Sequence, residues 1–292
     1  MSQANSISSL NVTANTSAGI DSKKSQSVGE LMRYWRKHSR LSQLDLALQM
    51  GSSSKHLSFV ETGRSHPSRG FILTFCDVLN LSLRQRNAVL LAANYSPQFQ
   101  EIGLQHEAMQ MVRDALQRML TQHEPYPAIV VDSSYRILMH NGGYSRLAKQ
   151  FLGDDKPAYD NAILMFLKKD GFYPFLQHRE IIVPFLLNRL RDEASATNNM
   201  QLQALIEALC VEHQELLDEV QAMSANSQRA DDAIESNLPV MTFTLKKDEL
   251  AVTFFTTITT MGTPLDLTCQ ELRIELLFPA DNTTRQGFLL DD

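Results

Sequence analysis

This chain of 292 residues is poor in cysteine, in long apolar runs and in positive charge. Its 3 cysteines, Cys76, Cys210 and Cys269, are too few and too far apart for a disulfide framework or a metal site, so we expect buried, reduced thiols. No apolar run approaches the roughly 18 residues that a membrane span requires. The polar N-terminus has neither the basic start nor the apolar stretch of a signal peptide, and we therefore expect a cytoplasmic protein.

Sequence signs of catalysis are also missing. His56, His66, His140 and His178 have no metal-ligand spacing, and the chain contains no HExxH, no phosphate loop and no GxSxG motif. The cysteines and histidines show no readable relation between a nucleophile and a base. We therefore predict no catalytic residue, no metal and no cofactor, and a protein that is not an enzyme.

The charge of the chain is unevenly distributed around its net value of −6. Residues 28–97 contain nine Lys or Arg against four Asp or Glu, a net charge of +5, whereas residues 98–292 contain sixteen against twenty-eight, a net charge of −12. A basic head on an acidic body would turn its head toward a polyanion such as DNA. Ordinary variation of surface residues can also give a net charge of this size, so the charge alone does not establish a DNA partner.

Composition and periodicity divide the chain into five segments. Residues 1–27 are small and polar without a period, which predicts a disordered tail. Residues 28–97 show five short helical patterns separated by Ser, Gly and Pro, which predicts an all-α head. Residues 98–124 are expected to connect the two halves through a helix at 101–121 that packs on its own domain. The body then covers 125–280, and 281–292 form a tail.

The period of the pattern changes at the start of the body. Two strands with a turn at 132–134 precede a helical stretch at about 143–223, and three further strands follow. In the last strand the apolar residues share one face, whereas Arg273 and Glu275 lie on the other. Five strands with helices inserted between the second and third predict an α+β domain with an antiparallel sheet.

Residues 43–64 carry the most informative motif. Two helices that cross steeply through a tight turn need a small residue at their contact and a turn residue that tolerates positive φ, and Ala47 and Gly51 meet these needs. Leu57 and Val60 can anchor the second helix from beneath, which leaves its other face free to enter a major groove. The same spacing also fits an amphipathic pair of helices used only for packing.

The residues predicted to contact DNA lie on the free face and at the flanks of this second helix. Lys55 can donate to guanine, Phe59 can touch a thymine methyl, and the serines can bind phosphate or base. The amide of Gln43 can reach the phosphate backbone from the preceding helix. The predicted set is Gln43, Ser53, Ser54, Lys55, His56, Ser58, Phe59 and Arg64.

The wider pattern resembles the phage-repressor, or Xre-type, helix-turn-helix family. The matching residues are Gln43, Ala47, Gly51, Leu57, Ser58, Glu61, Gly63, Arg64, Pro67 and Ser68. Ser52 departs from the family, in which many members carry valine. The run HLSFVETGRSHPS is similar to the subgroup that has an MmyB-like ligand-binding domain, and PYPAIVVDSSYRILMHNGGYSRLA resembles the beginning of that PAS-like domain. The resemblance covers residues 28–279. It implies a one-component regulator whose PAS-like half holds a hydrophobic small molecule, with a fatty acid as the expected effector.

Aromatic and aliphatic residues gather between the two groups of strands. They can line an apolar pocket or form an ordinary core, and both interpretations stand at this point. A pocket for an acyl chain needs a polar anchor, for which Asn141, Arg189 and Arg191 are candidates, because arginine can hold a carboxylate through two hydrogen bonds. The predicted ligand-binding residues are Asn141, Phe166, Phe172, Phe175, Phe185 and Arg189.

Together these features predict a sequence-specific DNA-binding transcriptional regulator. We expect a homodimer whose affinity for a double-stranded operator is modulated by a hydrophobic small molecule, with no membrane partner. Two alternatives remain open. One is an antitoxin-type interaction module whose head binds a protein and binds DNA weakly. The other is a catalytic PAS-like domain fused to a DNA-binding head.

Overall fold

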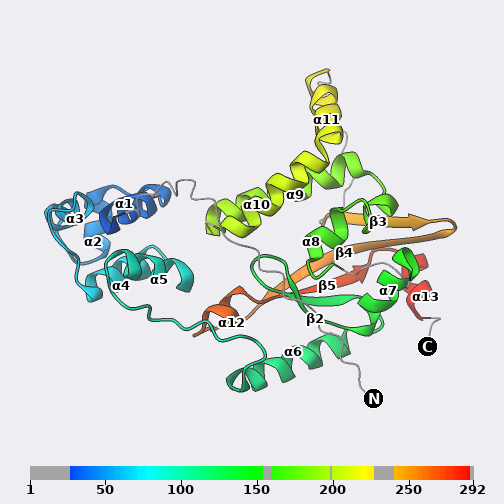
Figure 1. The fold of residues 1–292 in the computed structure, drawn as a ribbon, viewed down its shortest axis with the longest axis horizontal. Coiled ribbons are helices and arrows are strands. Elements are labelled where there is room, and N and C mark those ends of the chain that lie inside the picture. The colour runs from blue at the N-terminus through cyan, green and yellow to red at the C-terminus, as the bar shows by residue number, and fades with distance from the viewer. Residues whose placement is uncertain (1–26, 154–158, 198, 227–239, 290–292) are drawn as a thin grey trace, which may run out of the picture.

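A computed structural model of the chain describes residues 27–153, 159–197, 199–226 and 240–289. It consists of a helical head and a larger α+β body, as predicted (Figure 1). The predicted disordered tail lies outside the described residues except for Ser27, which caps the first helix. Among the described residues, no helix is both long enough and apolar enough to cross a membrane.

Five helices form the head, as the helical patterns predicted. They are α1 (Val28–His38), α2 (Gln43–Gln49), α3 (Ser54–Glu61), α4 (Arg69–Val78) and α5 (Leu83–Ala92). Before each helix a serine hydroxyl accepts a hydrogen bond from the backbone N–H of the third helical residue. Such caps satisfy donors that a helix leaves free at its start. The predicted capping box of Ser42 and Asp45 is present at α2.

One apolar core holds the five head helices together. Its fully buried members include Met32, Leu46, Leu57, Val60, Ile72, Phe75, Val89 and Leu90. The helices α1 and α3 approach each other closely, since a Cβ atom on Gly29 would lie 2.5 Å from the carbonyl oxygen of Val60. Only glycine fits at that position without moving a backbone.

The connection between head and body differs from the predicted helix at 101–121. The helical part begins with a 3-10 turn at Glu107–Met109 and continues as α6 (Gln110–Gln122). The preceding backbone is held in a non-helical path, because Asn87 bonds the backbone of Gln98 and Phe99 and Asp266 bonds the N–H of Ile102. As predicted, α6 packs on its own domain, with Leu116 and Leu120 against the sheet.

The body contains one five-stranded antiparallel sheet, which confirms the predicted architecture. Its strands lie in the order β2-β1-β5-β4-β3. They are β1 (Ala128–Val131), β2 (Ile137–His140), β3 (Thr242–Lys247), β4 (Leu250–Thr260) and β5 (Arg273–Pro279). The turn predicted at 132–134 extends further, because Tyr135 also lies in it, with φ 64° and a buried ring, and its N–H donates to the carbonyl of Asp132.

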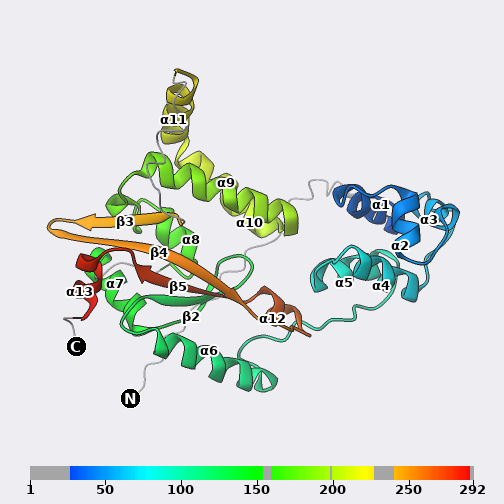
Figure 2. The same cartoon turned by 180° about the vertical axis from the view of Figure 1, so that it is seen from behind.

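Helices cover both faces of the sheet (Figures 1 and 2). On one face, α6 packs against β1 and β5. The other face carries α7 (Gly142–Leu152), α8 (Ala162–Leu167), a 3-10 turn (Tyr173–Phe175), α9 (Arg179–Thr197) and α10 (Met200–Glu212). The next helix, α11 (Gln214–Asn226), projects away from the sheet in both views. The main core of the body lies between the sheet and this second group of helices.

Two short helices complete the body. The first, α12 (Leu267–Glu271), leads directly into β5. The second, α13 (Asn282–Leu289), corrects our expectation of a tail at 281–292. It packs on the sheet because Phe288 is buried against Phe254 and the hydroxyl of Thr284 accepts a hydrogen bond from the backbone of Thr253. These contacts make residues 282–288 part of the folded body.

The head contacts the body through α5, which bonds α12 and the end of α9, where the side chain of Gln85 donates to the carbonyl of Ala196. Arg84 forms ion pairs with Glu271 and Glu101, at 2.5 Å and 2.9 Å. The side-chain oxygen of Gln270 accepts a hydrogen bond of 2.7 Å from the N–H of Leu83, the first residue of α5. These contacts are polar, and the buried apolar residues that the structure describes form separate cores in the two halves.

Candidate functional site

The helix-turn-helix unit of the head consists of α2, a tight turn and α3. Gly51 occupies the turn with φ 62°, a conformation that glycine adopts without strain. Ala47 is buried where α2 and α3 meet, and Leu57 and Val60 hold α3 from beneath. The roles that the sequence predicted for these four residues in the turn and the core agree with the structure.

A buried ion pair fixes this unit to α1. Arg36 donates from Nε and Nη2 to the two oxygens of Glu61, at 2.6 Å and 2.9 Å, and the side chain of Glu61 is 0% exposed. Burial alone would raise the pKa of Glu61, but the hydrogen bonds from Arg36 and Gln43 outweigh it and hold this pKa below its usual value. The last residue of α3 therefore stays ionised inside the head. Sequence reasoning did not assign this role to Glu61.

Two cations flank an aromatic ring on the outer side of α3. The ammonium of Lys55 lies 5.7 Å from the centre of the Phe59 ring, and the guanidinium of Arg64 lies 5.9 Å from it. Lys55 and Arg64 are exposed, and neither forms an ion pair within the described part of the chain. The three side chains form a surface that offers two positive charges and one apolar ring.

The other residues predicted to contact DNA occupy different positions. Ser53 is exposed, but its hydroxyl caps α3. His56, expected on the exposed face, is half-buried because its ring packs edge-on against Phe71 at 4.8 Å. Ser54 and Ser58 are half-buried. The amide nitrogen of Gln43 donates to Glu61 at 2.8 Å, which orients this side chain at the start of α2. Contact of these residues with DNA remains a prediction.

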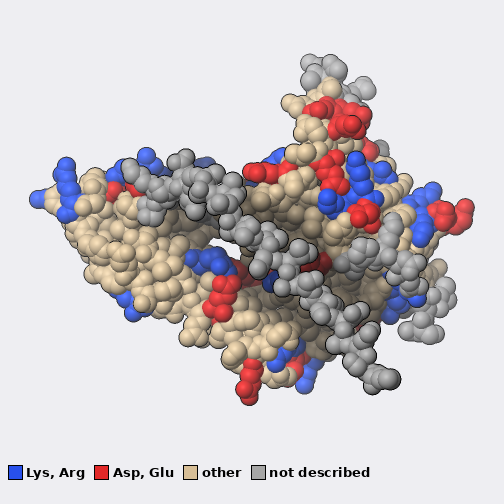
Figure 3. All heavy atoms as spheres, in the orientation of Figure 1, with Lys and Arg blue, Asp and Glu red and all other residues tan. Residues whose placement is uncertain are grey.

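Positive charge follows the outer end of the head. In the space-filling view, Lys and Arg side chains lie along the rim over α1 and α3, away from the body (Figure 3). Among the acidic residues of the head, Glu30 and Asp45 belong to capping boxes, Glu61 is buried, and Asp77 pairs with Arg86. With nine Lys or Arg against four Asp or Glu in residues 28–97, the head keeps a net positive charge.

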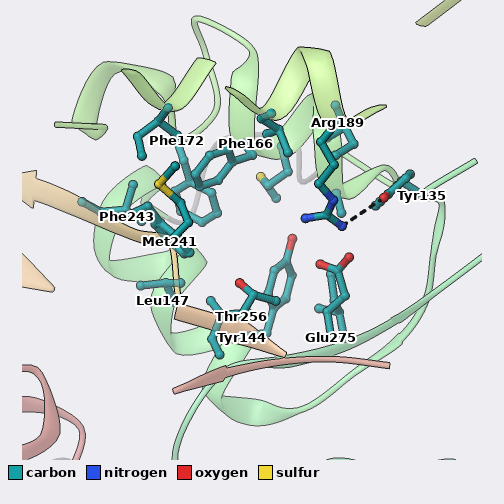
Figure 4. Close-up of a pocket in the computed structure, with 18 of the residues that line it drawn as sticks. Tyr135, Tyr144, Leu147, Phe166, Phe172, Arg189, Met241, Phe243, Thr256 and Glu275 are labelled. Carbon is teal, nitrogen blue, oxygen red and sulfur yellow. Dashed lines mark hydrogen bonds between the residues drawn. The ribbon is translucent and has the colours of Figure 1, made fainter. Parts of the chain in front are cut away.

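The body contains an apolar pocket between the sheet and helices α7, α8 and α9 (Figure 4). Its cavity volume is about 340 Å³, within the range of about 300–1,000 Å³ that is usual for small-molecule sites. Aromatic and aliphatic side chains make up most of the wall, among them Phe166, Phe172, Leu186, Met241 and Phe243. Phe185 also lines the pocket and is 46% exposed, which places it at the mouth.

Most polar groups of this pocket gather at one end. The hydroxyl of Tyr144, the guanidinium of Arg189 and the carboxyl of Glu275 point toward one another there (Figure 4). The Tyr144 oxygen is buried without a hydrogen-bond partner among the described residues, and burial raises its pKa. Burial also raises the pKa of Glu275, although Arg189 and Arg273 act in the opposite direction.

A small hydrogen-bond network supports this end from behind. Arg189 donates to the hydroxyl of Tyr135 at 3.5 Å, and that hydroxyl donates to Glu193 at 2.8 Å. The other oxygen of Glu193 forms an ion pair with Arg273. The network holds Arg189 only through the tyrosine, so its guanidinium keeps free donors toward the pocket.

Four of the six predicted ligand-binding residues meet in this pocket, and two do not. Phe166, Phe172, Phe185 and Arg189 line it. Asn141 lies outside, because its amide caps α7 and bonds the backbone of Leu120, Tyr126 and Ala128. Phe175 packs on Phe151 instead, with the ammonium of Lys247 over its ring. Arg191, the third candidate anchor, is not among the residues that line the pocket, and it donates to the sulfur of Cys210 in α10.

Sequence reasoning missed Tyr144 and Glu275. Glu275 stood out only as one of two charged residues on the polar side of the last strand, and that side points into the pocket rather than into solvent. Tyr144 follows the paired glycines at the start of α7, and no spacing connected it with a pocket. No group of three or more His, Cys, Asp or Glu suited to a metal ion occurs among the residues that the structure describes.

Comparison with known protein families gives two matches. Residues 112–290 match the family described as the MmyB-like transcription regulator ligand binding domain, and residues 27–89 match a helix-turn-helix domain. The first match contains the whole pocket, and the second contains α2, α3 and the surface around Phe59. No curated protein matches the chain.

Proposed function

The chain belongs to the family of MmyB-like transcription regulators, since the match to their ligand-binding domain spans more than half of it, and from this premise we propose how its two halves work together. The head of a homodimer binds a specific operator, and a fatty acid in the pocket of the body modulates that binding. The protein acts as a regulator and not as an enzyme.

The surface around Phe59 supports operator binding. An α-helix fits the major groove, where a Lys can donate to guanine O6 and N7 and an apolar side chain can touch a thymine methyl. Lys55 and Phe59 project from α3 in positions that suit these two contacts. Arg64 follows α3 and suits a phosphate contact, which adds affinity but no sequence preference.

The pocket supports a long, apolar ligand with a polar head. Its walls come from α8, α9 and the β3–β4 hairpin, and Arg189 stands at the polar end. Arginine binds carboxylates through paired hydrogen bonds, and this chemistry suits the head of a fatty acid. The acyl chain would then lie among Phe166, Phe172 and Phe243.

One observation supports communication between the two halves. The helix α12 directly precedes β5, the strand that bears Glu275, and α12 is hydrogen-bonded to α5 of the head. The helix α6 follows the head in the sequence and suggests itself as the route, but α12 contacts the head directly. A ligand that prefers one arrangement of β5 and α12 shifts the position of the head, whereas a ligand without such a preference shifts nothing.

Two heads related by a two-fold axis would bind half-sites about one helical turn apart. The test is selection of tight binders from random duplex DNA with the full chain, followed by titration against a scrambled duplex. We expect an inverted repeat that binds about 10³-fold or more tightly than the scrambled duplex. Equal affinity for both duplexes, together with a stable protein partner, would favour the interaction-module alternative.

A further inference from the structure

Three polar side chains face the same open space at the end of the pocket without bonding to one another. Tyr144 comes from α7, Arg189 from α9 and Glu275 from β5 (Figure 4). Within the described part of the chain, Glu275 makes no hydrogen bond or ion pair, and Tyr144 makes no hydrogen bond through its oxygen. Buried polar groups are normally satisfied, so this arrangement is suited to a ligand head group that completes it.

Two of the charged groups around this space already neutralise each other before a ligand arrives. Arg273 and Glu193 neutralise each other in an ion pair, and Tyr135 donates its hydroxyl hydrogen to the same glutamate. Two ionisable groups remain outside this ion pair, the guanidinium of Arg189 and the carboxyl of Glu275. The neighbouring wall from β4 contributes Thr256, which carries no charge, and the remaining wall is mostly apolar.

A carboxylate head would satisfy the donors here but would meet a second carboxyl. It can accept hydrogen bonds from Arg189 and Tyr144. If Glu275 were ionised as well, two negative charges would face one guanidinium in a pocket with mostly apolar walls. Two carboxylates that share such a site do not both ionise readily. With one shared proton the sum of charges becomes zero.

We propose that the pocket binds a carboxylate ligand together with one proton, which is held in a hydrogen bond between the carboxyl of Glu275 and that of the ligand. The inference rests on the proposed function, because it concerns the head group of a ligand in the same pocket. The proton comes from the buffer, one O–H bond forms, and no other covalent bond changes. In its protonated form Glu275 can donate a hydrogen bond to the ligand carboxylate, which an ionised Glu275 could not do.

This coupling sets the pH dependence of binding. Burial already raises the pKa of Glu275 in the empty pocket, so at low pH the proton is present and affinity is constant. Above that pKa each bound ligand must take up a proton, and affinity falls about tenfold per pH unit. Affinity stops falling once the pH exceeds the pKa at which the bound complex loses the shared proton. The charged groups that act on Glu275 are Arg189 and Glu193 from α9 and Arg273 from β5.

The experiment is calorimetric titration of the delipidated full chain with dodecanoic acid, in two buffers of different ionisation enthalpy, from about pH 5.5 to 9. The difference between the buffers gives the number of protons taken up per ligand. We expect about one proton in the range where affinity falls, and none with dodecan-1-ol, which has no carboxyl. Glu275→Gln should abolish the uptake and hold affinity near the low-pH value of the unaltered chain at every pH. Tyr144→Phe is the matched control, since it removes a donor and should weaken binding while the uptake stays.

Dodecanoate binding without proton uptake would overturn the proposal, as would unchanged uptake in Glu275→Gln. Binding of the alcohol but not of the acid would also overturn it, and would mean that the pocket binds an apolar ligand without a carboxylate head. If neither compound binds, the proposed sensing function fails as well. The measurement on the unaltered chain decides the matter even if the Glu275→Gln variant does not fold.

Discussion

Arg84 and Glu271, separated by 187 residues in the sequence, form a two-point ion pair between the head and the body, with contacts of 2.5 Å and 3.0 Å. Glu271 also accepts a hydrogen bond from the hydroxyl of Ser133, at the turn before β2. The Arg84 side chain is 49% exposed, and exposed ion pairs contribute about 0–1 kcal/mol. A contact of this strength can break and form again while both halves stay folded.

Removing this ion pair should therefore uncouple the two halves without unfolding them. We expect Arg84→Ala to reduce the effect of ligand on operator affinity several-fold, because α12 then loses its main ionic contact with α5. Thermal unfolding should change little, by less than about 1 kcal/mol in the free energy of unfolding. Arg118→Ala, an exposed change on α6, is the control. The exchange of Arg84→Glu with Glu271→Arg should restore part of the coupling, and an undiminished ligand effect in Arg84→Ala would exclude this route.

Lys55 and Arg64 should differ in their effect on DNA binding. Lys55→Ala should cost on the order of 1–3 kcal/mol at the cognate site and relax the preference for one base there. Arg64→Ala should weaken all sequences similarly and make the dependence of log affinity on log salt shallower by about one unit. Anisotropy titrations with cognate and random duplexes at several salt concentrations measure both. If Lys55→Ala weakens random DNA as much as the cognate site, the recognition surface is assigned wrongly.

The buried pair of Arg36 and Glu61 should dominate the acid stability of the head. Because the folded pKa of Glu61 is lowered, its contribution is complete above the pKa of an unfolded glutamate, about 4.3, and is lost as pH falls through the lower folded value. Glu61→Ala leaves Arg36 buried and unpaired and should cost about 3–5 kcal/mol in urea unfolding at neutral pH. The double variant Arg36→Met, Glu61→Met should be less destabilised than Glu61→Ala. If both variants lose the same free energy of unfolding, the unpaired charge of Arg36 is not the cause of the destabilisation.

The homodimer proposal predicts that an isolated head binds its operator weakly. A fragment of residues 28–97 carries its own apolar core and the cap of every helix after α1, so it should fold. Its affinity for the inverted repeat should be much lower than that of the full chain, because the second head is no longer present at high effective concentration. Sedimentation of the full chain and titration of both proteins measure this. The same affinity for fragment and full chain would mean that the body does not hold a dimer together.

The head could be predicted closely because local chemistry fixes it. The hydroxyl of Ser42, the freedom of Gly51 and the small side chain of Ala47 act within a few residues, so the chain itself indicates where α2 ends and α3 begins. Glu61 lies beyond such reasoning, since its partner Arg36 is 25 residues away and only the fold brings the two together.

The pocket could be predicted only in part. Its aromatic wall follows from the apolar bulk around α8 and α9, but its polar end is assembled from three separate elements. The sequence placed Glu275 on the face opposite the apolar residues of the last strand, but alternation in a strand shows which residues share a side and not what covers that side. Asn141 was chosen for its chemistry, yet its amide is fully used by the backbone at the start of α7.

Modulation of operator binding by a ligand is tested most directly by titrating operator DNA with delipidated protein, with and without a long-chain fatty acid, while fluorescence anisotropy is recorded. We predict a change in operator affinity of roughly 5- to 150-fold, and by reciprocity operator DNA should change the affinity for the fatty acid by the same factor. Phe166→Ala and Phe185→Ala should blunt the change while leaving ligand-free DNA binding nearly intact. If fatty acid binds and operator affinity stays the same, the body only stabilises the protein and the regulatory claim is wrong.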